Sequence, residues 1–350
     1  METVNRILQE KITARIAPNK AVLIFGARRV GKTVMMRKIV DNYSGRTMML
    51  NGEDYDTLAL LENRSIANYR HLLDGIDLLD IDEAQNIPQI GSILKLIVDE
   101  IPGISVLASG SSSFDLLNKT GEPLVGRSTQ FLLTPFSQRE IAQTETALET
   151  RQNLEARLIY GSYPEVVMME NYERKTDYLR DIVGAYLLKD ILAIDGLKNS
   201  SKMRDLLRLI AFQLGSEVSY NELSNLLGVD RGTVETYINL LEKCFVVFRL
   251  DSFSRNLRNE IKKCKKVYFY DNGVRNAVLS NFAPLERRND VGALWENLMV
   301  SERVKRNAYS GNYAQLFFWR THEQQEIDLI EEQDGMLHTF EFKWNGKARS

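Results

Sequence analysis

The feature that most constrains this chain is the stretch from Gly26 to Thr33, which fits the pattern G-x-x-x-x-G-K-[ST] at every fixed position. An apolar run, Ala21–Phe25, precedes it and a helical pattern follows, which is the context that this motif requires. Glycines let the main chain turn tightly, so that its N–H groups point at phosphate oxygens, and the start of the following helix adds partial positive charge. The stretch therefore predicts a phosphate-binding loop between a strand and a helix.

The side chains of this loop indicate its ligands. The ammonium group of Lys32 can bridge the β- and γ-phosphates of a nucleotide, and the hydroxyl of Thr33 can ligate Mg²⁺. We therefore predict ATP and Mg²⁺ as ligands. The predicted nucleotide-binding residues are Gly26, Ala27, Arg28, Arg29, Val30, Gly31, Lys32 and Thr33.

An apolar run that ends in two acids, Leu78–Glu83, supplies a second signal. Asp82, at the end of such a strand, can hold Mg²⁺ or its water. Glu83 can orient and deprotonate the attacking water, which predicts ATP hydrolysis. Asp80 does not fit this interpretation, because a central parallel strand is expected to be almost wholly apolar.

Two further segments offer catalytic candidates. The run Ile104–Ser111 ends in small polar residues, and Ser111 can place a hydroxyl near the γ-phosphate; a simple Ser/Gly turn explains the segment equally well. Arg127 precedes the apolar stretch Thr129–Leu133 and can serve as an arginine finger across a subunit boundary, which would make the protein a homo-oligomer. The alternative for Arg127 is an ordinary surface arginine.

The distribution of apolar runs predicts the fold class. In residues 21–136 apolar runs alternate with helical patterns, which is typical of an α/β fold with a parallel sheet covered on both faces. Residues 140–260 have mostly helical periodicity, and residues 265–345 mix strands with a helix. We therefore divide the chain into an ATPase domain (1–140), a helical region (141–264) and a small α+β module (265–350).

Composition and charge exclude several classes of protein. Lys and Arg number 45 against 47 Asp and Glu, a formal charge of −2, which excludes a globally basic nucleic-acid coat protein but not a local basic patch. The two cysteines, Cys244 and Cys264, have no histidine at metal spacing, so we expect buried thiols in a reducing compartment. No apolar run approaches the ~20 residues of a membrane span, and no signal peptide is evident, so we predict a cytoplasmic protein without a membrane partner.

Further motifs complete a resemblance to a known family. The chain carries, in this order, GARRVGKT, LLDIDEAQNIP, VLASGSSS, LVGRSTQFLLTPFS, GSYPEVV, FSRNLR, KVYFYDNG and GALWEN. Together they resemble a group of prokaryotic AAA+ superfamily ATPases, over nearly the whole chain. The resemblance implies a P-loop sheet of five parallel strands, with a sensor strand between the two Walker strands. It also implies nucleotide roles for Lys32, Thr33, Asp82 and Glu83, and a finger role for Arg127.

The helical region contains a pattern typical of a winged helix-turn-helix. Two short helices, Ser219–Gly228 and Asp230–Lys243, are followed by the strand Phe245–Leu250, and Asp230 is a good N-cap for the second helix. We predict DNA contacts from this helix and from the basic stretch that follows it, which can neutralise phosphates. A lid that packs on the ATPase core is the alternative. The predicted DNA contacts are Arg231, Thr233, Arg255, Arg258, Lys262 and Lys263, and the basic stretch continues to Lys266.

The last stretch is similar to the PD-(D/E)XK nuclease pattern. Glu296 lies on an expected helix, Asp328 opens a strand, and Glu341 and Lys343 are expected on the next strand with their side chains on one face. The acids can share a divalent metal while Lys343 holds a water or a phosphate, which makes these four residues a possible second metal site. Because the chain stops at Ser350, the module reads as cut short, either in a longer natural protein or as a vestige.

Three functions follow from these patterns. The first is an AAA+ ATPase that acts as a nucleotide switch coupled to a DNA-binding winged helix. The second is an ATP-gated nuclease in defence or repair. The third is a protein-interaction module that ATP orders, without nucleic acid.

Overall fold

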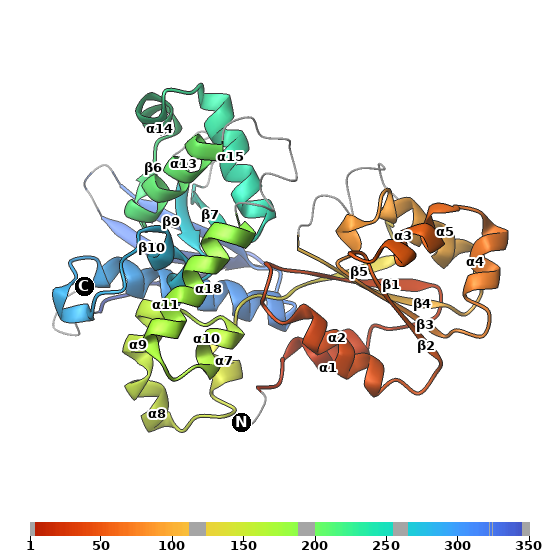
Figure 1. Cartoon of the computed structure of the whole chain (residues 1–350). Coiled ribbons are helices and arrows are strands. Elements are labelled where there is room, and N and C mark those ends of the chain that lie inside the picture. The colour runs from red at the N-terminus through yellow and green to blue at the C-terminus, as the bar shows by residue number, and fades with distance from the viewer. Residues whose placement is uncertain are drawn as a thin grey trace. The chain divides into compact units, whose positions relative to one another are not determined.

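The computed structural model describes residues 4–111, 124–187, 200–254, 265–321, 323 and 325–344. The chain divides into two compact units, Met1–Thr134 and Pro135–Ser350, which are drawn in Figure 1. We describe each unit by itself. In the described residues no helix is long and apolar enough to cross a membrane.

The first unit is built on a parallel sheet of five strands in the order β2-β3-β4-β1-β5. The strand β4 therefore lies between β1 and β3, which confirms the expected place of the sensor strand. The side chains of β1 and β4 are almost all buried, as strands covered on both faces require. The strands are β1 (Lys20–Phe25), β2 (Thr47–Asn51), β3 (Leu78–Asp82), β4 (Ser105–Gly110) and β5 (Ser128–Leu132).

Helices cover both faces of this sheet. Figure 1 shows α1 and α2 on one face and α4 and α5 on the other, and α2 contacts β3 and β4 while α5 contacts β1 and β4. The amphipathic pattern of α5 explains its position, because Ile93, Leu94 and Ile97 are all buried. The helical elements are α1 (Leu8–Thr13), α2 (Lys32–Asp41), α3 (Tyr55–Glu62), α4 (Ile66–Leu72), the 3₁₀ turn η1 (Ala84–Asn86) and α5 (Ile90–Glu100).

The second unit contains a mixed sheet of six strands in the order β11-β10-β9-β7-β8-β6. Strand β7 pairs with β9 in parallel, and the other pairs are antiparallel. Its core includes Phe248, Tyr268 and Phe318 from neighbouring strands and Val300 from α18. The strands are β6 (Glu217–Val218), β7 (Val247–Ser252), β8 (Lys265–Phe269), β9 (Gln315–Arg320), β10 (Glu326–Gln333) and β11 (Met336–Phe340).

This sheet takes strands from both sides of residue 264, where the sequence predicts a domain boundary. Strands β6 and β7 precede that residue and pair with β8, which follows it. Apolar patterning locates such strands but not their partners, so a shared sheet cannot be read from the pattern. The division of the second unit into two functional stretches stays a prediction.

Helices make up most of the described residues between 140 and 260, as the periodicity of that stretch predicts. Helix α11 is followed directly by the π-helical segment η2, and residues 188–199 lie outside the described part. The helical elements are α7 (Gln138–Ile141), α8 (Ala147–Gln152), α9 (Leu154–Tyr160), α10 (Pro164–Met168), α11 (Tyr172–Asp181), η2 (Ile182–Leu187), α13 (Ser200–Phe212), α14 (Tyr220–Leu227), α15 (Arg231–Lys243), α17 (Asn272–Val278), η3 (Leu285–Arg287) and α18 (Val291–Ser310).

Two of the family-like motifs meet in the second unit. Asp271, from YFYDNG, caps α17 and accepts a hydrogen bond of 2.6 Å from the backbone N–H of Ser162, in GSYPEVV. Gly273 lies so close to Tyr160 that a Cβ there would be 2.1 Å from its carbonyl oxygen. These residues join α9, α17 and the loop between α9 and α10, so their role in the fold is to hold the helices together.

Candidate functional site

The phosphate-binding loop leaves β1 at a glycine that no other residue can replace. Gly26 has φ +154°, and a Cβ on it would lie 2.1 Å from the carbonyl oxygen of Leu133. Gly31, with φ 96°, is left-handed and forms the N-cap of α2. Both glycines of the motif are thus required by the main-chain path that turns β1 into α2.

Lys32 is the first residue of α2 and its side chain is 4% exposed. Its ammonium group donates hydrogen bonds to the carbonyl oxygens of Gly26 (2.9 Å) and Ala27 (3.1 Å). The N-cap of α2 is Gly31, which makes no side-chain cap hydrogen bond, and the start of a helix is a favourable place for an anion. The loop therefore presents a cation and a helix start at one place, as phosphate binding requires.

Thr33 and Asp82 meet beside the loop. The Thr33 hydroxyl donates a 2.6 Å hydrogen bond to Asp82 Oδ2, and the Ser109 hydroxyl donates a short one to Asp82 Oδ1. The strand order explains this, since β4 carries Ser109 and lies next to β3, which ends at Asp82. Hydroxyl and carboxylate oxygens are the ligands that Mg²⁺ prefers, so this donor set fits the predicted ion.

Glu83 follows Asp82 in a left-handed conformation with φ 49°. Its carboxylate accepts a 2.6 Å hydrogen bond from the side-chain amide of Gln85, and the carbonyl oxygen of that amide accepts one of 3.3 Å from the N–H of Ser111. Ser109 also accepts a hydrogen bond of 3.1 Å from the Glu83 N–H. Gln85 thus links the predicted base to the end of the sensor strand.

Sequence reasoning missed two residues of this site. The hydroxyl that reaches Asp82 belongs to Ser109, whereas the contact of the predicted Ser111 described above uses its backbone N–H. The signal that distinguishes Ser109 is its place inside β4, next to β3, because Ser111 lies beyond the end of that strand at Gly110. Gln85 carries no motif signal; its place in η1 directs its side chain back to Glu83.

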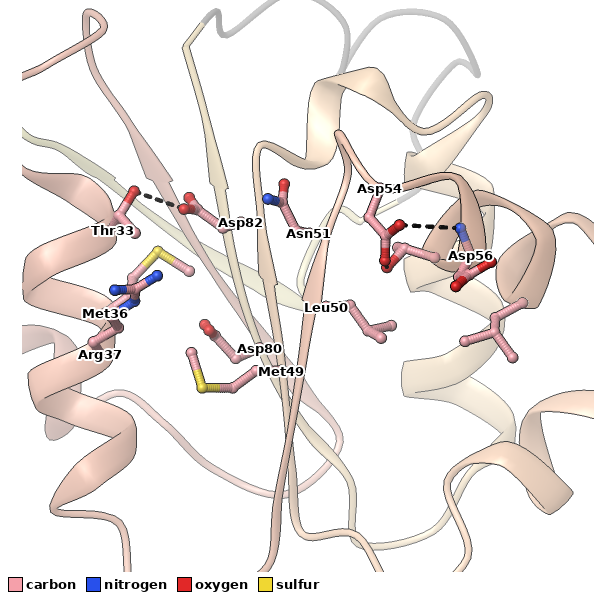
Figure 2. A pocket seen from close by; sticks show the side chains of 12 residues that line it. Thr33, Met36, Arg37, Met49, Leu50, Asn51, Asp54, Asp56, Asp80 and Asp82 are labelled. Atoms are coloured by element: carbon pink, nitrogen blue, oxygen red, sulfur yellow. Dashed lines mark hydrogen bonds between the residues drawn. The ribbon is translucent and has the colours of Figure 1, made fainter.

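Asp80, the acid that did not fit its strand, lines a cavity of about 320 Å³ next to Thr33 and Asp82 (Figure 2). It is 2% exposed, and its Oδ1 has no hydrogen-bond partner among the residues that the structure describes. Burial and the neighbouring Asp82 raise the pKa of Asp80 to about 7, against the opposing charge of Arg37.

Within the described residues, no group of three acids, histidines or cysteines is placed to hold a metal ion.

Arg127 lies far from the loop of its own chain. It directly precedes β5, and Ser128 at the start of that strand pairs with Ala21 at the start of β1, whereas the loop follows the other end of β1. Its guanidinium pairs with Asp99 at the end of α5. Arg127 therefore does not reach the nucleotide site of its own subunit, and a role in a neighbouring subunit stays a prediction.

The residues of the predicted second metal site come together only in part. Glu296, Glu326, Asp328 and Lys343 line a cavity of about 620 Å³ in the second unit. Glu341 instead pairs with Lys343 at 2.7 Å. The expectation that both lie on a strand is wrong, because β11 ends at Phe340.

The predicted DNA contacts have mixed outcomes. Arg231 is exposed at the start of α15, but Thr233 uses its N–H and hydroxyl on Asp230, the N-cap of the same helix. Lys265 pairs with Asp251 at 3.0 Å and Lys266 is buried, so neither extends the predicted basic stretch over the surface. Arg255, Arg258, Lys262 and Lys263 lie outside the described residues.

The loop, the two acids at the end of β3 and the position of β4 define the first unit as a P-loop ATPase domain. Comparison with known families agrees, since residues 18–142 match the family described as an AAA domain. Residues 151–285 and residues 291–350 match two domains of unknown function (DUF8612 and DUF4143).

Relatives cover most of the chain. An uncharacterized protein of Mycobacterium tuberculosis is 25% identical over 326 residues, 92% of this chain and 70% of that protein. One of Methanocaldococcus jannaschii is 21% identical over 344 residues, 93% of this chain and 75% of that protein. Among solved structures, a Walker-type ATPase of Pyrococcus abyssi has a TM-score of 0.50 at 13% identity and covers 80% of this chain and 98% of that chain, a likeness of fold.

Proposed function

We propose that this chain hydrolyses ATP with Mg²⁺ as cofactor and works as a nucleotide-operated switch of the AAA+ superfamily. The observation that carries the proposal is the 2.6 Å contact between Thr33 and Asp82 beside a buried Lys32. These two oxygen ligands would hold Mg²⁺, and the bound ion would neutralise charge on the β- and γ-phosphates.

ATP binding in this proposal exchanges one set of partners of Lys32 for another. The ammonium now donates to two carbonyl oxygens of its own loop, which are neutral acceptors. Phosphate oxygens are charged acceptors and form roughly twofold stronger hydrogen bonds, so a nucleotide displaces the carbonyls. The N–H groups at the start of α2 add further donors to the same phosphates.

Hydrolysis in this proposal uses Glu83 as the general base that takes a proton from the attacking water. Gln85 and Ser109 hold the residue in place, one through its carboxylate and the other through its N–H. An arginine finger from Arg127 of a second copy would complete the site by stabilising charge on the transferred phosphate.

A test of the enzymatic part measures phosphate release by the full chain with ATP and Mg²⁺, with EDTA, and for Thr33→Ala. We expect turnover in the first condition alone. If the parent protein releases no phosphate at any protein concentration or oligomeric state, the proposal of hydrolysis is wrong and only ATP binding remains. Thr33→Val keeps the shape without the hydroxyl and is the matched check that the oxygen is what matters.

The switch part predicts that nucleotide alters the second unit. We compare hydrogen exchange of residues 135–350 in Glu83→Gln, which is designed to hold ATP, with and without the nucleotide. Protection that changes in the second unit supports a switch. Changes confined to the first unit would reduce the protein to an ATPase without this coupling.

DNA binding is a second candidate function, and one observation favours it. Strand β6 lies between α13 and α14, strands β7 and β8 follow α15, and β8 pairs antiparallel with both β6 and β7. This order of three helices and three strands is the one expected for a winged helix, and Arg231 is exposed at the start of its recognition helix.

The corresponding experiment measures fluorescence anisotropy of a labelled DNA duplex with the full chain at two salt concentrations. Binding that weakens with salt, and weakens further in Arg231→Ala, supports this function, since released counterions make phosphate contacts salt-dependent. Lys202→Ala, on α13, is the matched control. Absence of binding at low salt favours the interaction module that ATP orders.

A further inference from the structure

The acidic cluster of the second unit contains a cation that belongs to the protein. Lys266, on β8, is 1% exposed, and its ammonium group contacts carboxylates from two other elements. It lies 3.2 Å from Glu296 Oε1 on α18 and makes a short ion pair with Glu326 on β10. Glu296, one of the acids that the sequence assigns to a divalent metal, is therefore engaged by an amine together with its neighbour Glu326.

The surroundings of this ammonium suit an amine better than a metal ion. Its nitrogen lies 5.5 Å from the centre of the Phe318 ring, an attractive contact for an ammonium. A divalent cation needs oxygen or nitrogen ligands around it, and a phenyl ring supplies none. Glu296 Oε1 is further engaged by the hydroxyl of Tyr268 at 2.6 Å.

The cavity next to this ammonium is lined by charges of both signs. Its acids are Glu296, Glu326 and Asp328, and its bases are Arg320 and Lys343; Lys266 pairs with the first two acids. A divalent ion added beside this ammonium would place like charges next to one another in a half-buried site.

We infer that Lys266 is the resident cation of this cluster and holds Glu296 and Glu326 in place of a divalent metal. The predicted four-residue metal site does not fit the structure, because Glu296 is bound to the amine and Glu341 pairs with Lys343 instead of lining the cavity. The cluster then works as an ion-pair lock that ties α18 to β8 and β10. No nuclease chemistry that depends on a metal at these residues follows.

The first experiment titrates Mn²⁺ into the full chain without nucleotide, by calorimetry, for the parent and for Asp328→Asn. We expect identical isotherms, since any weak binding belongs to the first unit. A parent affinity that falls in Asp328→Asn would overturn the inference, because it would place a metal at this cluster.

The second experiment removes the amine. In Lys266→Ala the three acids lose their cation, and we expect Mn²⁺ to bind at least about tenfold more tightly than in the parent and to raise the melting temperature. The double variant Lys266→Ala/Asp328→Asn is expected to lose that gain. A folded Lys266→Ala with no gain in affinity would show that the amine does not stand where a metal would.

Two controls keep this experiment decisive. Lys265→Ala removes the neighbouring lysine, whose partner is Asp251, and is expected to behave as the parent. If Lys266→Ala does not fold alone, it is refolded with and without Mn²⁺; recovery with Mn²⁺ alone supports the inference, and no recovery leaves the parent titration to decide. ATP hydrolysis is not used as a readout, so failure of the proposed ATPase does not affect the result.

Discussion

Each unit of this protein buries one lysine at a site that the sequence marks as functional, and the two lysines differ in their partners. Lys32 is 4% exposed and donates to carbonyl oxygens of its own loop, while Lys266 is 1% exposed and pairs with two carboxylates. Neutral carbonyls are weak acceptors that a phosphate can displace, whereas carboxylates compensate the charge fully. Lys32 can therefore exchange neutral carbonyl partners for a phosphate. Lys266 is held by two carboxylates, and its role is structural.

The largest effect that we expect is in the first unit, where replacing Glu83 tests whether this acid takes part in catalysis or only supports the fold. Glu83→Gln removes the base but keeps the shape, and its neighbour Gln85 can still contact the new amide. We expect ATP turnover to fall about 1,000-fold, within the range for loss of a general base, with ATP affinity retained. Steady-state phosphate release together with a nucleotide-binding titration checks both parts.

Glu62→Gln, on the exposed side of α3, is the matched control for this change and is expected to act as the parent. If Glu83→Gln still turns over ATP, the general base is another residue. Glu83 would then have a structural role, like the acids around Lys266.

Lys32→Ala gives the next largest effect and addresses the comparison directly. The variant loses the cation that phosphate oxygens would contact, so we expect ATP affinity to fall about 100-fold, which corresponds to about 2.7 kcal/mol. Because the ammonium donates to two neutral carbonyl oxygens, the free energy of unfolding is expected to change by less than about 1 kcal/mol. Calorimetric titration with ATP and urea denaturation measure the two quantities.

Lys38→Ala, on the same helix, controls for loss of a lysine without loss of the loop contact. A large loss of stability in Lys32→Ala would remove the distinction between the two lysines.

The fold of the first unit could be predicted from the sequence nearly in full. A strand before Gly26, a helix after Lys32 and apolar runs at regular intervals leave few arrangements other than a parallel sheet with helices on both faces. The position of β4 between β1 and β3 came from the resemblance to a family, because apolar periodicity does not specify the order of strands.

The parts that the sequence could not predict depend on contacts between distant segments. Lys266 was interpreted as part of a basic stretch, because its burial depends on Glu296 and Glu326, which follow it by many residues. Glu341 was placed on a strand that ends one residue before it, at Phe340. In the loop, by contrast, Lys32 contacts Gly26 and Ala27 of the same motif, so its place could be predicted from a short stretch of sequence.

The second unit contains another buried ion-pair network, around Asp290. Replacing Asp290 tests whether a carboxylate that pairs with buried cations has a structural role there too. Asp290 pairs with Arg275 and Arg288, and although burial opposes them, these guanidinium groups lower its pKa to about 2. We expect Asp290→Asn to lose about 2 kcal/mol of the free energy of unfolding at pH 7, since a shift of one unit corresponds to about 1.4 kcal/mol.

The pH dependence of this loss has a defined sign. A carboxyl with a lowered pKa stabilises the folded state above its unfolded pKa, and that stabilisation disappears as the pH falls from about 4 to about 2. Urea denaturation of both proteins at pH 7 and at lower pH should therefore give curves that converge below about pH 4. Asp177→Asn, with a side chain 67% exposed, should show no such difference. Curves that stay apart at low pH would assign the loss to packing instead of charge.

The smallest expected effect concerns Gln85, which touches the predicted base without taking part in proton transfer. Its amide fixes one oxygen of Glu83 and links it to the N–H of Ser111 at the end of β4. In Gln85→Ala the carboxylate loses this support, and we expect kcat to fall about tenfold, about 1.4 kcal/mol, while ATP affinity is unchanged. Gln152→Ala, on the exposed end of α8, is the control. A rise in kcat would mean that the hydrogen bond from Gln85 restrains Glu83. The phosphate site would then resemble the cluster of Lys266, because in both sites a donor of the protein itself would hold a carboxylate in place.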